Sequence, residues 1–324
     1  MKATRVTPVT MSPEVRTRPT APARLVRLAA GLAVCAFAAG TLGACATAAS
    51  QAADTVCPAD GIRYGVQPQG NPAELELAYA GFAAALSDEL DCPVEVKVFE
   101  DPAAVVAALD EGTIQIVHLT PVGYAVVSRT AGATPVATFS RPNGNMATYK
   151  SAIWVPADSG IAVPGDLAGH TLALGKQGTT QGDILPRKAL ADARIPLGEV
   201  GVTYTGGQQE SLAALVNGEA EAAQIDSQTM AAAVAAGEFE PDAHRMIWES
   251  GAVPSDPIVV PDGSGEAFVT AVEAALLNLE PDPVGKVGAK IGLAPGGRLV
   301  GIDDIAYTEL GALVDSLSLT AADL

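Results

Sequence analysis

The feature that most constrains the fold is an alternation of strand-like and helix-like segments that is broken twice. Apolar strand patterns start at Ile62–Val66 and alternate with helical patterns as far as 134–139. A turn-forming run at 141–145 interrupts the alternation, a second alternating block follows, and the proline-containing run 253–257 interrupts it again before a mostly helical tail. Such alternation is typical of parallel sheets covered by helices on both faces.

The two interruptions bracket the second block, so the simplest topology is a clamp of two lobes between which the chain crosses twice. We predict an α/β fold in which lobe 1 comprises 57–146 and 251–324 and lobe 2 comprises 147–250. Each lobe is expected to hold a mostly parallel sheet flanked by helices. The ligand cleft would lie between the lobes, because α/β sheets bind ligands at the carboxyl ends of their strands. The alternative is one continuous sheet.

The start of the chain predicts export. A basic region is followed by the uncharged stretch 28–44, which is short for a membrane span but fits the apolar part of a signal peptide. The motif 42–45 (Leu-Gly-Ala-Cys) resembles a bacterial lipobox. We therefore expect 1–44 to be a lipoprotein signal peptide and Cys45 to carry lipid at the start of a linker, 45–56. The protein would be anchored to the outer face of the cytoplasmic membrane; an ordinary secretory signal and a retained membrane anchor are the alternatives.

Charge excludes one class of partner. The first 44 residues hold six of the 19 Lys and Arg and one of the 37 Asp and Glu, so the remaining 280 residues carry 13 basic and 36 acidic side chains and a formal charge of −23. A field of this sign repels nucleic acid and anionic lipid headgroups. An anionic ligand would have to be captured by local geometry rather than by net attraction.

Two cysteines remain in the expected mature domain, Cys57 and Cys92, each just before a predicted strand. Successive parallel strands often lie side by side, and an exported protein permits oxidation. We predict a disulfide between them; two separate buried thiols are the alternative. The chain has only three His, none spaced at i,i+3 or i,i+4 from another, so we expect no metal and no cofactor.

A glycine- and threonine-containing loop follows the predicted strand at 171–175. Its residues Thr179, Thr180, Gln181 and Gly182 run directly into a predicted helix. Glycines let the backbone approach a ligand, and free N–H groups at a helix start favour an anion. The loop does not have the spacing of a P-loop. Taken alone, it is equally compatible with an ordinary capped strand-to-helix turn.

The wider sequence around this loop resembles the phosphate/phosphite/phosphonate-binding proteins of ABC importers. The matching segments cover most of 60–300 and include 149–155, 158–161, 166–169, 178–186 and 253–259. The resemblance implies a type II periplasmic-binding-protein clamp that captures a phosphorus oxyanion and delivers it to a membrane permease. Thr179 and Thr180 stand where the family has ligand-binding hydroxyls, whereas Gln181 places an amide where the family has a serine.

Four further residues are candidate ligand contacts. Asp226 lies at a strand end and either caps the next helix or accepts from a protonated oxyanion, which would exclude sulfate. Thr120 and Pro121 lie at the corresponding strand end of lobe 1, where Thr120 caps a helix, contacts the ligand, or does both. Tyr149 either lines the cleft or packs. His118 is expected to be structural.

Two departures from the family bear on the ligand. Members that bind 2-aminoethylphosphonate use an acidic residue and a tyrosine, which align near Gln209 and Pro102. Their loss would leave a buried ammonium poorly compensated, so phosphite, methylphosphonate or phosphate is expected instead.

We therefore expect a monomeric binding protein rather than an enzyme, since the chain has no nucleophile elbow, His-based triad spacing or metal cluster. The alternatives are a sensory lipoprotein that signals to a membrane kinase, a binder of another small organic ligand, and an exported hydrolase.

Overall fold

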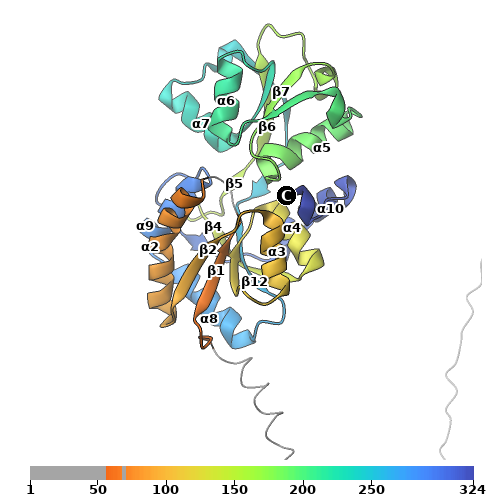
Figure 1. The fold of residues 1–324 in the computed structure, drawn as a ribbon. Helices are drawn as coiled ribbons and strands as arrows, with labels where there is room; N and C mark the ends of the chain where they lie inside the picture. Colours follow the sequence, from red (N-terminus) through yellow and green to blue (C-terminus); the bar gives the residue numbers. More distant parts are fainter. Residues whose placement is uncertain (1–55, 68–70) are drawn as a thin grey trace, which may run out of the picture. The chain divides into compact units, whose positions relative to one another are not determined.

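The computed structural model describes residues 56–67 and 71–324, and these residues form two sheets with helices against both faces of each (Figure 1). The expected signal peptide, Cys45 and most of the linker lie outside the described residues. Within the described ranges, no helix combines the length and the apolar character needed to cross a membrane.

The larger sheet has six strands in the order β13-β4-β12-β3-β1-β2. Its strands are β1 (Ile62–Val66), β2 (Val94–Val98), β3 (Ile116–His118), β4 (Ala133–Phe139), β12 (Pro257–Pro261) and β13 (Leu299–Val300). Its helices are α2 (Pro72–Leu90), α3 (Pro102–Asp110), α4 (Pro121–Thr130), α8 (Glu266–Asn278), α9 (Pro281–Lys290) and α10 (Thr308–Leu317). We call this sheet and its helices the six-stranded lobe.

The smaller sheet has five strands in the order β10-β6-β9-β7-β8. They are β6 (Ser151–Pro156), β7 (Thr171–Leu174), β8 (Gly201–Tyr204), β9 (Ala222–Asp226) and β10 (His244–Glu249). Its helices are α5 (Leu185–Asp192), α6 (Gln208–Val216) and α7 (Ser227–Ala236), and a π-helical turn, η2 (Thr180–Ile184), precedes α5. We call this unit the five-stranded lobe.

The chain crosses between the lobes twice, and the crossings pair with each other. They form the two-stranded ribbon of β5 (Thr148–Tyr149) and β11 (Val253–Pro254), in which Tyr149 is opposite Val253. The domain limits predicted from the sequence stay a prediction, but the order of the strands agrees with a chain that leaves the six-stranded sheet after β4 and returns to it as β12.

Both sheets contain antiparallel pairs beside the parallel pairs that the sequence predicted. β1 pairs in parallel with β2 and β3, but β12 runs antiparallel to β3 and β4, and β6 runs antiparallel to β9 and β10. The reason is the crossing: β6 and β12 enter their sheets from the ribbon instead of from a helix of the same lobe. A strand that does not follow a right-handed helical crossover is not restricted to parallel pairing.

Three helices of the six-stranded lobe begin at the same local signal. Asn71, Asp101 and Thr120 each act as an N-cap whose side-chain oxygen accepts a main-chain N–H, and each is followed by proline as the first helical residue. A capping oxygen satisfies an otherwise unpaired donor, and proline has no N–H to satisfy there. The helix starts are therefore encoded locally.

The apolar cores lie on both faces of each sheet. One cluster joins the six-stranded sheet to α2, α8 and α9 and contains Phe82 and Leu276, both fully buried. A second joins the opposite face to α3, α4 and α10, and it also takes in Ile184 and Leu185 from the five-stranded lobe. This second cluster is shared between the lobes, so their contact is partly apolar.

The predicted disulfide is present. Cys57 and Cys92 are bonded, with Cα atoms 5.5 Å apart, at the beginnings of β1 and β2, where Ile62 is in register with Val94. The bond closes a loop across a sequence separation of 35 residues and connects the first described segment to the sheet.

Removing this disulfide is expected to lower stability. The double substitution Cys57→Ser, Cys92→Ser should reduce the free energy of unfolding by about 4 kcal/mol, because a cross-link across a loop of this length restricts the unfolded chain. Urea unfolding measures the difference. Ser87→Ala is the control, since it removes only the hydroxyl that donates to the Cys92 carbonyl (2.8 Å) and should cost about 1 kcal/mol or less. Equal losses in the two variants would contradict the prediction.

Candidate functional site

The start of α4 is the point at which the two lobes exchange a hydrogen bond. The Thr120 hydroxyl caps the helix by accepting the Gly123 N–H (3.0 Å). The next free donor, the Val122 N–H, points across to the other lobe and donates to Thr180 Oγ1 at 2.9 Å. Thr120 and Thr180 are both fully buried. The Thr180 hydroxyl oxygen of the five-stranded lobe therefore lies at the N-terminus of α4, where negative charge is favoured.

Tyr149 stands beside this contact with an unused donor. Its side chain is buried, and its hydroxyl makes no hydrogen bond of normal geometry to a described residue, although the Thr180 hydroxyl is close enough to interact with it. Burial raises the pKa of the Tyr149 phenol well above its usual value and the nearby Asp256 adds to this, while the neighbouring Thr180 hydroxyl acts in the opposite direction. Burying a hydroxyl without a hydrogen-bond partner costs about 1–3 kcal/mol of solvation free energy, and a new hydrogen bond would be needed to offset that cost.

The threonine loop is more internally bonded than the sequence indicated. The Gly178 N–H donates to Asp183 Oδ2 (2.9 Å), and Thr179 Oγ1 donates to the Lys176 carbonyl (2.7 Å). Asp183 is fully buried and also accepts from the Tyr204 hydroxyl at 2.7 Å. The Gly178 N–H is therefore used within the loop and does not face a ligand, contrary to the simplest interpretation of the sequence.

The next N–H groups of the loop remain available. Those of Thr180, Gln181 and Gly182 open the π-helical turn, and they have no acceptor within the part of the chain that the structure describes. Gly182 is required at its position, because a Cβ there would lie 2.6 Å from Thr179 Oγ1. This close packing holds the turn against β7.

A small cavity of about 190 Å³ lies on the other side of the same loop. Three predicted residues line it: Thr179, Gln181 and Asp226. The six-stranded lobe contributes the end of α9 around Lys290. The cavity is thus lined by both lobes.

Asp226 is the N-cap of α7, which is the first of the two roles predicted for it. Its Oδ1 accepts the N–H groups of Gln228 (2.8 Å) and Thr229 (2.7 Å), and Oδ2 accepts the Thr229 hydroxyl (3.2 Å). Burial raises the pKa of the Asp226 carboxyl, and the bonds from α7 only partly offset that shift. Capping gives Oδ2 a single bond and leaves it capacity to accept another, and Asp226 lines the cavity, so the second role stays a prediction.

Sequence reasoning missed a partly buried amide pair at the wall of this cavity, in which Gln224 is buried and Gln208 lines the cavity. Gln208 and Gln224 bond to each other through both amide groups (2.9 and 3.2 Å), and Gln208 Oε1 also accepts the Asp226 N–H at 2.7 Å. Gln224 donates further to Ser151 Oγ, which donates to the Gln181 carbonyl. This chain of bonds ties Asp226 to Gln181. The sequence did hold one signal for this pair, the position of Gln208. It lies shortly after β8, just as Thr120 lies shortly after β3 and Asp226 lies at the end of β9.

The charges around the small cavity are balanced. Lys176 and Lys290 line it together with Glu210 and Asp226. Partial burial lowers the pKa of the Lys176 ammonium, and Lys290 is paired with Glu74 at 2.7 Å. Glu210 Oε2 would lie only 2.3 Å from a Cβ on Gly207, so this carboxylate folds back over the start of α6. There it interacts favourably with the helix dipole.

The eight predicted ligand residues fall into two groups on either side of the loop. Thr120, Pro121, Tyr149 and Thr180 meet at the start of α4 and form what we call the interlobe joint. Thr179, Gln181 and Asp226 line the small cavity, and Gly182 packs against Thr179 and the backbone of 175–176.

His118 belongs to the core beside the joint. It is buried, bonds to the Tyr79 hydroxyl through Nδ1, and places Nε2 3.4 Å from Asp256 Oδ2. Its contacts all lie within the six-stranded lobe, as expected for a structural residue.

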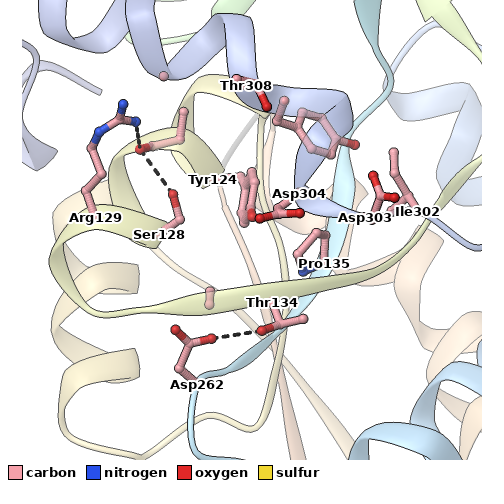
Figure 2. A pocket seen from close by; sticks show the side chains of 14 residues that line it. Tyr124, Ser128, Arg129, Thr134, Pro135, Asp262, Ile302, Asp303, Asp304 and Thr308 are labelled. Atoms are coloured by element: carbon pink, nitrogen blue, oxygen red, sulfur yellow. Dashed lines mark hydrogen bonds between the residues drawn. The ribbon is translucent and has the colours of Figure 1, made fainter. Parts of the chain in front are cut away.

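A larger cavity of about 610 Å³ lies in the six-stranded lobe, between α4, β4 and α10 (Figure 2). None of the predicted ligand residues lines it. Its carboxylates are Asp262, which accepts from the Thr134 hydroxyl (2.8 Å), Asp303 and Asp304. The one arginine there, Arg129, pairs with Asp315. Three carboxylates against one paired arginine oppose the binding of an anion, despite the larger volume. No group of three or more His, Cys, Asp or Glu within 56–67 and 71–324 is arranged to hold a metal ion.

Comparison with solved structures identifies the fold. PhnD1 from Prochlorococcus marinus (MIT 9301), in complex with methylphosphonate, is 15% identical over 79% of this chain and 98% of its own, with a TM-score of 0.63. A binding protein of an ABC phosphonate transporter from Pseudomonas aeruginosa is 16% identical over 78% and 84%, with a TM-score of 0.61. XAC2383 from Xanthomonas citri, bound to ATP, is 18% identical over 82% and 98%, with a TM-score of 0.66.

These relatives have the two-lobe fold of periplasmic binding proteins, so the predicted fold class is confirmed. At these identities they establish the fold alone. The family is established by a separate match, which spans residues 64–293 and therefore both lobes. The chain belongs to the family described as ABC transporter, phosphonate, periplasmic substrate-binding protein.

Proposed function

We propose that this protein captures a small phosphorus oxyanion at the interlobe joint and delivers it to the permease of an ABC importer. The observation that carries the proposal is the unpaired Tyr149 hydroxyl, which is buried beside the hydrogen bond from Val122 to Thr180. Folded proteins rarely leave a buried donor unused without a functional reason. An oxyanion at this place would accept from the phenol.

The joint also offers the other donors that such a ligand needs. With the lobes together, Thr180 Oγ1 accepts the Val122 N–H and its own O–H remains a donor, so a phosphonate oxygen beside the joint can accept from Thr180 and from Tyr149. The N–H groups of the π-helical turn lie on the same loop. Capture then depends on local donors, which suits a chain whose formal net charge is −18.

Asp226 and the small cavity would accommodate the rest of the ligand. A carboxylate accepts but does not donate, so it tolerates a protonated phosphorus oxyanion and repels sulfate. The cavity volume of about 190 Å³ suits methylphosphonate, phosphite or phosphate better than a nucleotide. The ammonium group of 2-aminoethylphosphonate would need a carboxylate in the cavity. Gln209 is uncharged, and the Glu210 carboxylate is turned onto the start of α6, so we expect this ligand to bind more weakly.

Attachment to the membrane belongs to the same proposal. A lipid on Cys45 would keep the protein close to its permease, with 45–56 as the tether and 57–324 as a monomeric two-lobe domain. A sensory lipoprotein would use the same clamp, and genes for a permease and an ATPase next to this one would favour transport.

Titration calorimetry with methylphosphonate, phosphite, phosphate, 2-aminoethylphosphonate, sulfate and ATP tests the ligand class. We expect saturable binding of one of the first three and weaker binding of 2-aminoethylphosphonate. Thr180→Ala should weaken it by about tenfold or more, as expected for a lost bond to a charged oxygen. Thr130→Ala, at the far end of α4, is the control. Tighter binding of 2-aminoethylphosphonate, or no binding of any phosphorus oxyanion, would contradict the proposal.

Tyr149→Phe separates a ligand role from a packing role. Since the hydroxyl makes no hydrogen bond of normal geometry in the fold, its removal should leave the free energy of unfolding unchanged or raise it by up to about 1 kcal/mol. Affinity for the bound oxyanion should fall about tenfold. Tyr307→Phe is the matched control, because the buried Tyr307 hydroxyl donates to the Ser255 carbonyl (2.7 Å) and its loss should lower stability. Unchanged affinity in Tyr149→Phe would remove Tyr149 from the site.

Asp226→Asn tests the exclusion of sulfate. The amide oxygen can still accept the N–H groups that cap α7, so the fold should persist while the negative charge is lost. We expect the ratio of sulfate affinity to methylphosphonate affinity to rise by about tenfold, equivalent to about 1.4 kcal/mol of repulsion. Calorimetry with both anions measures the ratio. A constant ratio would mean that Asp226 is only a helix cap.

A further inference from the structure

The segment after α10 is folded into a turn that contacts both lobes. The backbone leaves α10 at Ser318, which has a φ of 52°. Asp323 Oδ2 then accepts from the N–H and the hydroxyl of Thr320, both at 2.8 Å, and Thr320 Oγ1 accepts the Ala322 N–H. These bonds define the shape of 320–324. We call this segment the latch.

One side of the latch is anchored on the six-stranded lobe. Leu319, which leads into it, is buried in the apolar cluster of α3, α4 and α10, and Ala321 and Leu324 pack against the same cluster. The turn itself contacts α3 and α4. The anchor is therefore apolar and lies on the helix whose first turn forms the interlobe joint.

The other side of the latch meets the threonine loop of the five-stranded lobe. A Cβ built on Gly178 would lie 1.9 Å from the main-chain carbonyl carbon of Leu324 and 2.6 Å from its Cα. The approach is possible only because residue 178 is glycine. Arg187 of α5 adds a weak attraction, since it contributes to lowering the pKa of Asp323, although the bonds from Thr320 are the main cause. Figure 1 shows the end marked C at the level where the lobes meet.

This contact lies within two residues of the hydrogen bond that joins the lobes. Gly178 precedes Thr179 and Thr180, and Thr180 is the acceptor for the Val122 N–H. The crossing ribbon has only two residues per strand. So short a connection can act as a hinge and does little to prevent the lobes from opening. A segment that is anchored on one lobe and rests on the loop of the other adds such a restraint.

We propose that the latch, Thr320–Leu324, stabilises the arrangement in which Thr180 meets the start of α4 and thereby regulates how tightly the joint holds its ligand. The part that concerns ligand rests on the function proposed above. A contact made only when the lobes are together raises the population of that state. The apparent dissociation constant for a ligand that needs that state falls in proportion.

Two variants break the contact in different ways. Gly178→Ala keeps every residue of the latch but places a methyl group where Leu324 lies. A second variant ends after Leu319 and removes the latch. Gly169→Ala is the matched control, because Gly169 has nearly the same φ (80° against 77°), belongs to the same lobe, and has nothing within 4 Å of its Cβ position. Both alanines carry the same left-handed strain, and only one meets the latch.

The readout without ligand is the exchange of two neighbouring amide protons, followed by NMR on the full chain. The Val122 N–H is bonded across the lobes, whereas the Gly123 N–H is bonded to Thr120 within one lobe. In Gly178→Ala and in the shortened chain, Val122 should exchange about fivefold faster or more, with Gly123 unchanged, because the lobes open more often. Gly169→Ala should match the wild type at both positions.

The second readout is the dissociation of methylphosphonate, or of whichever oxyanion the titrations show to bind. Both latch variants should release it faster by the factor seen for Val122, with little change in the association rate. Equal Val122 exchange in Gly178→Ala and Gly169→Ala would overturn the latch, even if ligand binds normally. If no oxyanion binds to the wild type while Val122 responds as expected, the proposed function fails and the latch stands.

Discussion

The contact between Thr180 and the start of α4 is the interaction on which the rest of the site depends. It pairs a helix N-terminus of one lobe with a hydroxyl of the other, and both groups are excluded from water. In such surroundings a hydrogen bond is strong and an unpaired donor is costly. Ile184, four residues further along, buries itself in the apolar cluster of the six-stranded lobe. The loop is therefore held at the joint by one polar and one apolar contact.

In the proposed function, the same joint accounts for the binding of an anion by an acidic protein. The formal net charge is −18, so long-range attraction is absent. What remains is short-range: oriented N–H groups, hydroxyls and a buried phenol act over hydrogen-bond distances that solvent and salt do not screen. The larger cavity of the six-stranded lobe has more volume, but its carboxylates give it the wrong sign (Figure 2).

The mixed sheets and the clamp have a common origin in the two crossings. Because β12 returns through the ribbon, it runs antiparallel between β3 and β4 and brings Asp256 next to His118. Because β6 enters its sheet from the same ribbon, Ser151 at its beginning reaches the Gln181 carbonyl and ties the loop to the amide pair of Gln208 and Gln224. The connection between lobes thus also builds the support below the site.

The sequence by itself determined the local elements, the disulfide and the positions of the candidate residues at strand ends. These follow from short-range rules: caps followed by proline begin α2, α3 and α4, and apolar periodicity marks the strands. Only the tertiary structure decided that Thr180 bonds to Val122, that Asp183 takes the Gly178 N–H, and that Tyr149 keeps an unused hydroxyl. The first and the third depend on residues from separate elements that meet in a buried place, and the second depends on how a single loop folds when it is packed. Periodicity and caps carry information about neighbours along the chain and none about which donors compete for one acceptor after packing.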